Sequence, residues 1–381
     1  MKEQPLAIIQ NKQLVSALDL SLDEWKGWFF SRGLPAFCAK QVVQWIHQKG
    51  VLDPEKFTNL AKSTREILCK EFSWQLPKID SHLTSIDTSE KFLIETDDKH
   101  LFEMVLMPYD NRVTLCISSQ VGCRMGCTFC QTGKMGLKRH LSSGEILSQL
   151  LIAQQHLNER KITNVVFMGM GEPLDNYDEV LKACRLMVDK NGWGLSKHRV
   201  TVSTSGIVPE IKKLGKDLPV RLAISLHEAD DEKRSKMMPV NRQYPLSDLK
   251  QALLEYPAPK RFGITIEYVM IEGKNDSITE AKKLVKYLSG LKVKVNLIPI
   301  NHFPGIEMKP SAANSLRRFQ KYLSDRSIPA PIRYSRGQDI SGGCGQLAAK
   351  RKDDLATDPR ILHRSRRKIE RSQTSQSLPK S

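Results

Sequence analysis

The sequence predicts an α/β protein: a partial (β/α)6 barrel of the TIM type, preceded by a small helical domain. Three observations support this fold class. Residues 20–75 carry helical patterns, six strand-like runs alternate with helical segments from residue 112 onwards, and polar or Gly-rich clusters follow five of the six runs. Alternating strands and helices favour a parallel sheet, and such folds carry their chemistry at the carboxyl ends of the strands.

The first 78 residues are expected to form a helical accessory domain. Ser21 is a suitable N-cap for a helix over Leu22–Ser31, which the following Gly-Leu-Pro ends. Further helices are expected over Ala39–Lys49 and Leu60–Phe72, because apolar residues recur there at helical spacing. Trp45 lies on such an apolar stripe, which favours a place in the core over a role as a base-stacking platform.

A β-hairpin is expected over residues 91–107, within a linker region at 79–111, with its turn at Asp97-Asp98. In its second strand Glu103 shares one face with Leu101, Val105 and Met107. A carboxylate on an apolar face is unusual, because burying an unpaired charge is costly. Burial would make Glu103 a stronger base, whereas a salt-bridged or rim glutamate explains the position equally well.

Residues 112–349 are expected to form the barrel core. Strands are expected over Val113–Ser119, Asn164–Met168, Arg199–Ser203, Val220–Ser225, Gly263–Met270 and Lys294–Pro299. Helices are expected between and after them, over Gly144–Gln155, Tyr177–Asp189, Val208–Leu214, Leu246–Leu254, Ile278–Leu288 and Ala312–Leu323. Residues 350–381 form a basic, Ser/Gln-rich tail that is expected to be disordered.

Composition and charge narrow the classes of protein. The chain has 381 residues and a formal net charge of +17, and the tail from Lys350 onwards accounts for only part of that excess. A basic body favours a polyanionic partner such as nucleic acid, although excess charge can also serve solubility. No apolar run approaches the ~20 residues of a membrane span, and the N-terminus lacks a secretory signal. We therefore expect a cytoplasmic protein without disulfide scaffolding.

Three cysteines within eight residues, Cys123, Cys127 and Cys130, are the strongest chemical signal. Three thiolates fall one short of a closed tetrahedral zinc site, and they suit a [4Fe-4S] cluster with one iron free of protein ligands. This C-x3-C-x2-C spacing is that of the radical S-adenosylmethionine (SAM) enzymes. Two alternatives stay open at this point: a zinc loop completed by a distant Cys or by His140, and a redox C-x-x-C pair.

Polar clusters follow the first, second, third, fourth and sixth strands. Glycines in Gly169-Met-Gly171 allow the backbone to approach a ligand closely. Side chains of the remaining clusters have the groups needed to hold the amino, carboxylate and ribose parts of a nucleoside cofactor. These candidates are Glu172, Ser203, Ser225, His227 and Asn301.

Two further cysteines stand out. Cys116 lies in the strand just before the cysteine loop, and Cys344 lies among glycines in Ser341-Gly-Gly-Cys-Gly345. An accessible thiol of this kind reads equally well as a nucleophile and as an incidental free thiol. Cys38, Cys69 and Cys184 fall in helical stretches and are interpreted as small buried residues.

Taken together, the ordered motifs resemble the RlmN/Cfr family of radical methyltransferases, which methylate an adenine of large-subunit ribosomal RNA. The resemblance runs from about residue 20 to residue 350. It rests on the cysteine triplet and on the segments Thr114–Gln120, Met168–Leu174, Gly194–Lys197, Val202–Gly206, Ala223–His227, Ile266–Met270, Val295–Pro299 and Cys344–Leu347.

The resemblance implies a role for each matching residue. The triplet would hold the [4Fe-4S] cluster, Glu103 would be the proton acceptor, Cys344 the methyl-carrying cysteine, and Cys116 the thiol that closes a transient disulfide with it. The positions that match the cofactor contacts are Gly171, Glu172, Ser203, Ser225, Leu226, His227 and Asn301.

The implied reaction uses two SAM molecules per turnover. Cys344 takes a methyl group from the first, and a 5′-deoxyadenosyl radical from the second abstracts hydrogen from that methyl. The carbon radical adds to the adenine ring, and proton loss with attack by Cys116 releases the product. The resemblance favours carbon C2 in 23S rRNA and of the adenine beside the tRNA anticodon, with C8 of 23S rRNA as the alternative.

The remaining expectations concern partners and departures from the family pattern. The protein is expected to be a monomer that takes electrons from a small redox protein and does not contact a membrane. Ile300 and His302 replace residues usual in the family, as does the segment Gln338–Gly343 before the reactive cysteine, and these changes would alter the fit around the substrate. A non-catalytic RNA-binding protein with a structural metal loop is the hypothesis from another class.

Overall fold

The structure, a computed structural model, describes residues 14–259, 263–349 and 351. Its centre is one sheet of nine strands in the order β13-β12-β11-β10-β9-β6-β5-β4-β3. The six strands from β13 to β6 run parallel to their neighbours, which confirms the predicted parallel core. These strands are β6 (Arg112–Cys116), β9 (Asn164–Phe167), β10 (Val200–Thr204), β11 (Arg221–Ser225), β12 (Ile264–Met270) and β13 (Val293–Pro299).

Three antiparallel strands extend this sheet beyond β6. The predicted hairpin is present, and its second strand pairs directly with β6, so these residues form one continuous sheet with the barrel strands. The prediction did not include the outermost strand, β3. The three are β3 (Lys78–Thr84), β4 (Glu90–Glu95) and β5 (Leu101–Tyr109). The proposed division of the chain at residues 78, 111 and 349 stays a prediction.

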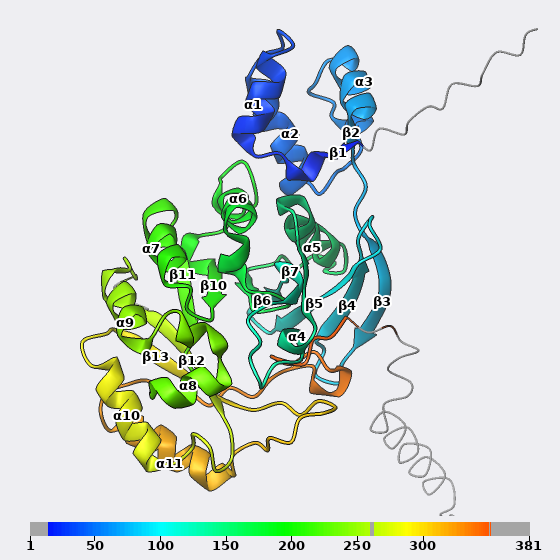
Figure 1. The fold of residues 1–381 in the computed structure, drawn as a ribbon. Helices are drawn as coiled ribbons and strands as arrows, with labels where there is room; N and C mark the ends of the chain where they lie inside the picture. Colours follow the sequence, from blue (N-terminus) through cyan, green and yellow to red (C-terminus); the bar gives the residue numbers. More distant parts are fainter. Residues whose placement is uncertain (1–13, 260–262, 350, 352–381) are drawn as a thin grey trace, which may run out of the picture.

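Helices cover one face of the parallel strands (Figure 1). The predicted ones are α5 (Ser143–Gln155), α6 (Tyr177–Val188), α7 (Val208–Asp217), α9 (Leu246–Glu255), α10 (Ile278–Leu288) and α11 (Ala313–Ser324). Elements that sequence periodicity did not show are α4 (Gln131–Lys134), α8 (Asp231–Met237) and the hairpin of β7 (Gln120–Cys123) with β8 (Gly136–His140). Short 3-10 helices occur at Ala17–Asp19, Pro54–Lys56, Pro173–Asn176, Lys197–Arg199, Pro239–Arg242 and Gln338–Ile340.

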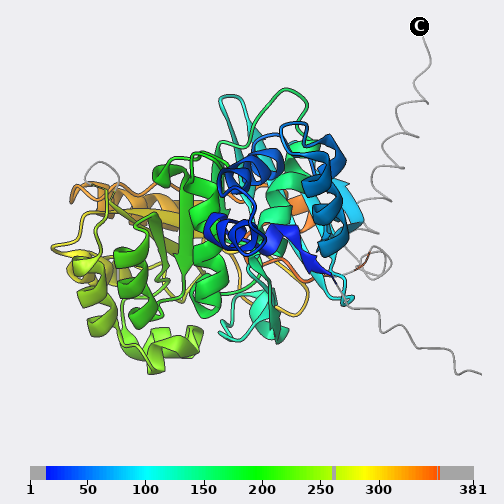
Figure 2. The same cartoon turned by 90° about the horizontal axis from the view of Figure 1, so that it is seen from above.

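The N-terminal helices lie beside α5 and α6 (Figures 1 and 2), where the Gly144 amide donates to Asp19 at 2.7 Å. They are α1 (Leu22–Phe30), α2 (Phe37–His47) and α3 (Lys62–Glu71), joined by the strand pair β1 (Val15–Ser16) and β2 (Phe72–Ser73). Ser21 caps α1, as predicted, and Glu24 completes a capping box with it. Trp45 stacks on Phe57 at 5.4 Å between ring centroids and packs against the core, which confirms its structural interpretation.

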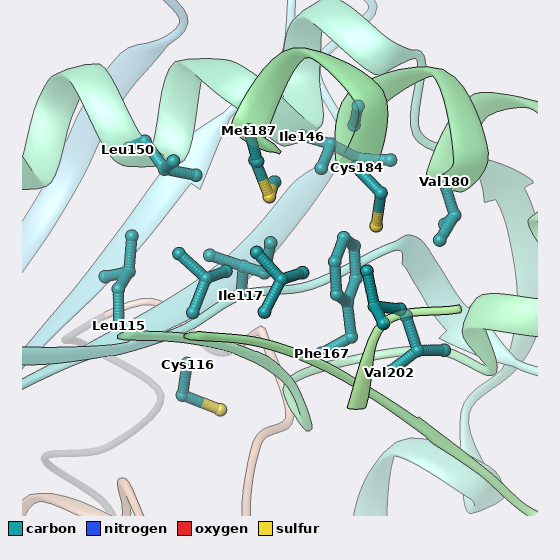
Figure 3. Close-up of a cluster of buried hydrophobic side chains, with 14 of the residues drawn as sticks. Leu115, Cys116, Ile117, Ile146, Leu150, Phe167, Val180, Cys184, Met187 and Val202 are labelled. Carbon is teal, nitrogen blue, oxygen red and sulfur yellow. The ribbon is translucent and has the colours of Figure 1, made fainter. Parts of the chain in front are cut away.

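Alternation along the strands gives the sheet two different faces. In β6 and just after it, Leu115 and Ile117 point towards α5 and α6, where they meet apolar side chains such as Ile146 and Met187 (Figure 3). Cys116 points to the opposite face (Figure 3). The helix-facing side is therefore the hydrophobic core, and the other, concave side is left for polar chemistry.

Two predictions concern the ends of the chain and membranes. Apart from Arg351, the expected disordered tail at 350–381 lies outside the described residues. Within the described residues, none of the helices combines the length and the apolar character that a membrane span requires.

Candidate active site

The cysteine loop is held in place by a small hairpin. Cys123 ends β7 and Cys130 immediately precedes α4. Gly122, one residue before Cys123, has a φ of +76°, and a Cβ there would lie 1.9 Å from the Gly136 carbonyl oxygen of β8. Only glycine fits this close crossing, so the hairpin fixes where the loop starts.

The three loop thiols face a protected environment. Cys123 is buried, and Cys127 and Cys130 are half-buried. Burial raises the pKa of Cys123 to about 12 and the pKa of Cys127 well above its ordinary value. Thiols in this setting become good ligands only when a metal stabilises the thiolate.

His140, one suggested fourth zinc ligand, has another partner in this structure. Among residues 14–259, 263–349 and 351, no three His, Cys, Asp or Glu side chains are grouped to hold one metal ion. The imidazole of His140, the suggested fourth ligand, instead lies 3.0 Å from the Gln120 amide nitrogen through Nδ1. A [4Fe-4S] cluster makes a different demand, because each thiolate binds a different iron atom.

The loop opens into a cavity of about 170 Å³ at the carboxyl ends of the parallel strands. Most of the sequence-predicted site residues line it together: Cys123, Cys127, Cys130, Gly171, Glu172, Ser203, Ser225, His227, Asn301 and Cys344. Three predicted residues, Glu103, Cys116 and Leu226, are not among its lining residues. The Leu226 side chain is fully buried, and its amide donates to the Glu267 carbonyl oxygen.

Glu172 is a carboxylate fixed by backbone donors. It accepts hydrogen bonds from the Ser205 amide at 2.7 Å and the Leu174 amide at 3.1 Å. Burial raises its pKa, although these donors favour the ionised form. Gly171 before it has a φ of +102°, and a Cβ there would lie 2.8 Å from the Gln120 backbone nitrogen. The turn therefore requires glycine, and it places an oxygen acceptor in the cavity.

His227 lines the same cavity in a strained conformation, with a φ of +59°. Its Nδ1 accepts a hydrogen bond from the Val269 amide at 2.9 Å, and its ring meets Phe129 edge-on at 4.6 Å. Burial lowers the pKa of His227 to about 3, and the nearby Arg234 charge acts in the same direction. The imidazole is therefore neutral, with its proton on Nε2, and serves as a fixed donor.

Arg234 in α8 was not predicted as a site residue. It is fully buried and donates to three backbone carbonyls at the ends of β10 and β11: Leu226 at 3.1 Å, Ser205 at 2.7 Å and Ser225 at 3.1 Å. The remaining guanidinium nitrogen, Nη1, donates to Asn241 Oδ1 at 2.7 Å. Arg234 thus fixes the strand ends that carry the candidate cofactor residues.

The segment that carries Cys344 packs directly on the cysteine loop. The Gln131 amide donates to the Gly345 carbonyl at 2.8 Å, and the Thr132 hydroxyl donates to the Leu347 carbonyl at 2.7 Å. The Asn301 amide group donates to the Cys344 carbonyl at 2.9 Å. Asn301 therefore positions the reactive segment, a contact that the sequence did not suggest.

Cys344 has exposed surface, and it lines this cavity together with the three loop cysteines. The surrounding protein raises its pKa to about 11, chiefly by burial and next by the charge of Glu267. Cys116 lies close enough for its own titration to depend on Cys344, and burial raises the pKa of Cys116 as well. The two thiols that the resemblance pairs are therefore neighbours in space.

Glu103 is buried and forms an ion pair. Its Oε1 lies 2.8 Å from Lys91 Nζ, and both side chains are at most 5% exposed. Its Oε2 accepts hydrogen bonds from the amides of Ala348 at 2.7 Å and Ala349 at 3.1 Å. Glu103 is therefore salt-bridged, and its carboxylate also holds the end of the Cys344 segment; its role as a base stays a prediction.

The residues present fit a cluster and a SAM molecule. One wall of the cavity offers three sulfur ligands, and the other walls offer a carboxylate, hydroxyls and a neutral imidazole. Cys123, Cys127 and Cys130 would hold the cluster, and the strand-end residues would hold the polar groups of SAM. These ligand assignments stay a prediction.

The chain is similar to several known proteins. Residues 117–285 match the family model of the radical SAM superfamily, and residues 15–73 match the ribosomal RNA large subunit methyltransferase N-terminal domain. A radical SAM methyltransferase from Sphaerobacter thermophilus has a similar structure, with a TM-score of 0.83 and 39% identity, covering 88% of this chain and 100% of that one.

Curated relatives cover nearly the whole chain. A dual-specificity RNA methyltransferase RlmN from Alcanivorax borkumensis is 42% identical over 93% of this chain and 96% of its own length. The corresponding proteins of Nitratiruptor sp. and Marinobacter nauticus are 45% and 42% identical, over 83% and 91% of this chain and 94% and 96% of their own lengths.

The fold and the cysteine site thus define a radical SAM enzyme, a class that uses a [4Fe-4S] cluster and SAM. Within that class the chain belongs to the RlmN family of RNA methyltransferases. Membership of an enzyme family favours catalysis over the alternative of a non-catalytic protein with a metal loop.

Proposed function

We propose that this enzyme methylates C2 of an adenine in 23S rRNA, and C2 of the adenine beside the anticodon in tRNA. The observation that carries the proposal is the placement of Cys344. Its thiol opens into the cavity lined by Cys123, Cys127 and Cys130, and Cys116 lies behind it on β6. A methyl carrier, a resolving thiol and cluster ligands are thus gathered at one place.

The chemistry of adenine C2 explains why a carrier is needed. C2 lies between two ring nitrogens, is electron-poor, and does not attack a sulfonium methyl group. In the proposed reaction the Cys344 thiolate takes the methyl group first, which leaves a thioether. When bound, the cluster and SAM supply the 5′-deoxyadenosyl radical that takes one hydrogen atom from this methyl group. The carbon so activated on Cys344 can bond to C2 without a nucleophilic ring.

Release of the product requires a base and a second thiol. Addition to C2 leaves an unpaired electron on the ring, and this electron is handed back to the one-electron redox partner. Glu103 is the carboxylate assigned to remove the C2 proton, and Cys116 is the thiol assigned to attack the Cys344 sulfur. That attack forms a Cys116–Cys344 disulfide, while the carbon keeps the electrons of the broken C–S bond and takes up a proton. Burial of Cys116 protects the resolving thiol until the adduct has formed.

The Cys344 segment must move for Glu103 to act. Both oxygens of the carboxylate are occupied, Oε1 by Lys91 and Oε2 by the amides of Ala348 and Ala349. Release of these two amides would free one oxygen for the substrate. Ser341 and Ala349, near the ends of the segment, have φ values of +54° and +49°. Non-Gly residues with such angles favour a segment that can change conformation.

Partners and setting follow from the same proposal. A small redox protein would supply electrons, and the enzyme would act as a monomer in the cytoplasm, where its RNA substrates are made. C8 of the same rRNA remains the alternative target.

The test is anaerobic reconstitution with iron, sulfide, SAM and an rRNA fragment, followed by mass mapping of the methylated carbon. The proposal expects 2-methyladenine, and Cys344→Ala is expected to abolish it. The interpretation of Cys69 as a buried residue is wrong, because Cys69 is exposed, and it lies outside the cavity. The matched variant Cys69→Ala should therefore keep full activity. A methyl group on C8, or an active Cys344→Ala enzyme, would reject the proposal.

A further inference from the structure

The interior face of the barrel continues below the cavity, towards the ends where the strands begin. Side chains two residues apart on a strand point to the same face of the sheet. Counting back in steps of two from the cavity-lining residues therefore identifies the interior-facing residues at the start of each strand. Ser225, Ser203 and Ile298 line the cavity at the strand ends. The interior positions that begin the six strands are Arg112, Asn164, Thr201, Arg221, Thr265 and Lys294. We call these six residues the strand-start belt.

The composition of the belt is unusual for a barrel. Barrel interiors are ordinarily filled by layers of branched apolar side chains, whereas every belt residue is polar and three are cationic. Thr265 is buried, Arg112 is exposed, and the other four are partly exposed. The lower layer is therefore not a packed core, whereas the helix-facing positions of the same strands are mostly apolar.

Positive charges gather around this belt. The pKa of Lys294 is lowered, first by burial and then by the charges of Arg221, Arg333 and Arg112. Among the described residues, no carboxylate forms an ion pair with Lys294, Arg112 or Arg333. Glu267, two residues after Thr265 on β12, faces these charges and lines the first cavity. Like charges held together cost stability, which favours a functional reason for them.

A second cavity is lined by one belt residue and by further cationic side chains. It has a volume of about 410 Å³ and is lined by Arg112 together with Tyr109, Arg160 and Arg336. The Arg112 guanidinium lies 4.2 Å from the centroid of the Tyr109 ring, and Arg336 lies 4.6 Å from it. Arg336 also donates to the Pro108 carbonyl at 2.8 Å, which fixes its position. Arg112 therefore belongs both to the belt and to the wall of this cavity, which carries three arginines and one carboxylate, Asp110.

We propose that the strand-start belt and the second cavity receive the sugar-phosphate backbone of the RNA that flanks the target adenine. The inference rests on the proposed function and adds the direction of entry: the nucleotide enters from the end where the strands begin. Arg221 precedes Ser225 by four residues, which is roughly 13 Å along a strand. A base turned out of its stack can reach Cys344 over such a length while its phosphates stay among the cations.

The shape of the site favours RNA over a protein partner. A small acidic redox protein would also be attracted to positive charge, but its folded surface cannot enter a recessed interior layer. A single-stranded nucleotide chain can, because its bases and phosphates separate as it extends. Docking of the electron donor at this end is therefore the competing outcome of the test.

The test uses the reconstituted full-length enzyme and its Lys294→Gln and Arg112→Gln variants. Binding of a fluorescent RNA hairpin that carries the target adenine is measured over a series of salt concentrations. Each variant is expected to lower the slope of log K against log salt by about 0.7 to 0.9, the loss of one phosphate contact. The matched control is Lys321→Gln on α11, which removes an equal charge from a side chain that is 76% exposed on the outer surface.

Two further measurements separate the possible failures. Methylation of Cys344 by SAM, read by peptide mass, needs no RNA and should be unchanged in both variants. The melting temperature of Lys294→Gln should be equal to or above that of the parent, because a repelled charge is removed. Unchanged salt slopes in both variants, or loss of reduction by the redox donor with normal RNA binding, would overturn the inference. If the parent enzyme bound the RNA hairpin normally but did not methylate it, the proposed function would be refuted instead.

Discussion

Lys91→Met is a direct probe of the buried ion pair beneath the reactive segment. Lys91 and Glu103 are 5% and 2% exposed, so removing the lysine leaves a carboxylate without its countercharge in the interior. Breaking a buried pair in this way costs 3–5 kcal/mol. Glu103 would keep its two backbone donors, Ala348 and Ala349, so the lower end, about 3 kcal/mol, is expected.

This loss converts into a measurable shift. An unfolding entropy of about 2.1 cal/mol/K per residue gives a decrease in Tm of about 4 °C for a chain of this length. Thermal unfolding of the cluster-free protein, followed by circular dichroism, would measure it. The double variant Lys91→Met/Glu103→Leu should recover most of the loss, because no unpaired charge remains.

A matched surface pair provides the control. Lys99 forms an ion pair with Glu95 at 2.9 Å in the neighbouring turn, but its side chain is 77% exposed. Lys99→Met should therefore change the Tm by less than about 1 °C. Equal shifts for Lys91→Met and Lys99→Met, or no recovery in the double variant, would refute the argument that burial makes the first pair important.

Two other predictions concern the cysteine loop and acid stability. Gly122→Ala should abolish cluster loading, measured as iron per chain, because the new Cβ would collide with the Gly136 carbonyl. Gly273→Ala is the control: Gly273 has a similar φ of +66°, but a Cβ there would have no neighbour within 4 Å, so this variant should load normally. Iron content retained in Gly122→Ala would contradict the role of the hairpin. His47 is buried, and burial lowers its pKa to about 4 from an ordinary value near 6.5. The buried, neutral imidazole adds to the free energy of unfolding. This contribution is fully present above pH 6.5 and is lost as the pH falls towards 4, because the imidazole of the unfolded chain takes up the proton first. The loss is about 3 kcal/mol. Urea unfolding at pH 7 and pH 4.5 should show a smaller decrease for His47→Leu than for the parent, and equal decreases would argue against this origin.

The strands and the cavity were predictable because their signals are local. Each parallel strand is a short run of β-formers followed by polar residues, and parallel strands end at one edge of a sheet. Cys123, Glu172 and His227 follow different strands, so the topology alone brings them together. The capping box of Ser21 and Glu24 is likewise contained in four residues.

Other features depend on contacts between distant segments. Lys91 meets Glu103 only because β4 and β5 pair in one register, in which Lys91 lies opposite Val105 and Glu103 opposite Leu93. A charged residue at an interior-facing position of β4 was the available sequence signal. Arg234 lies in a seven-residue helix with four other charged residues, where arginine ordinarily faces solvent. The hairpin of β7 and β8 escaped detection because its strands are short and interrupted by the cysteine loop.

The central claim is that the methyl group reaches RNA through Cys344 and loses a hydrogen atom on the way. The most direct test supplies SAM with a trideuterated methyl group and weighs the methyladenine formed. Abstraction from methyl-Cys344, followed by uptake of a solvent proton at release, predicts a product with two deuterium atoms. A product that keeps all three would contradict the account, because it would mean direct transfer of an intact methyl group.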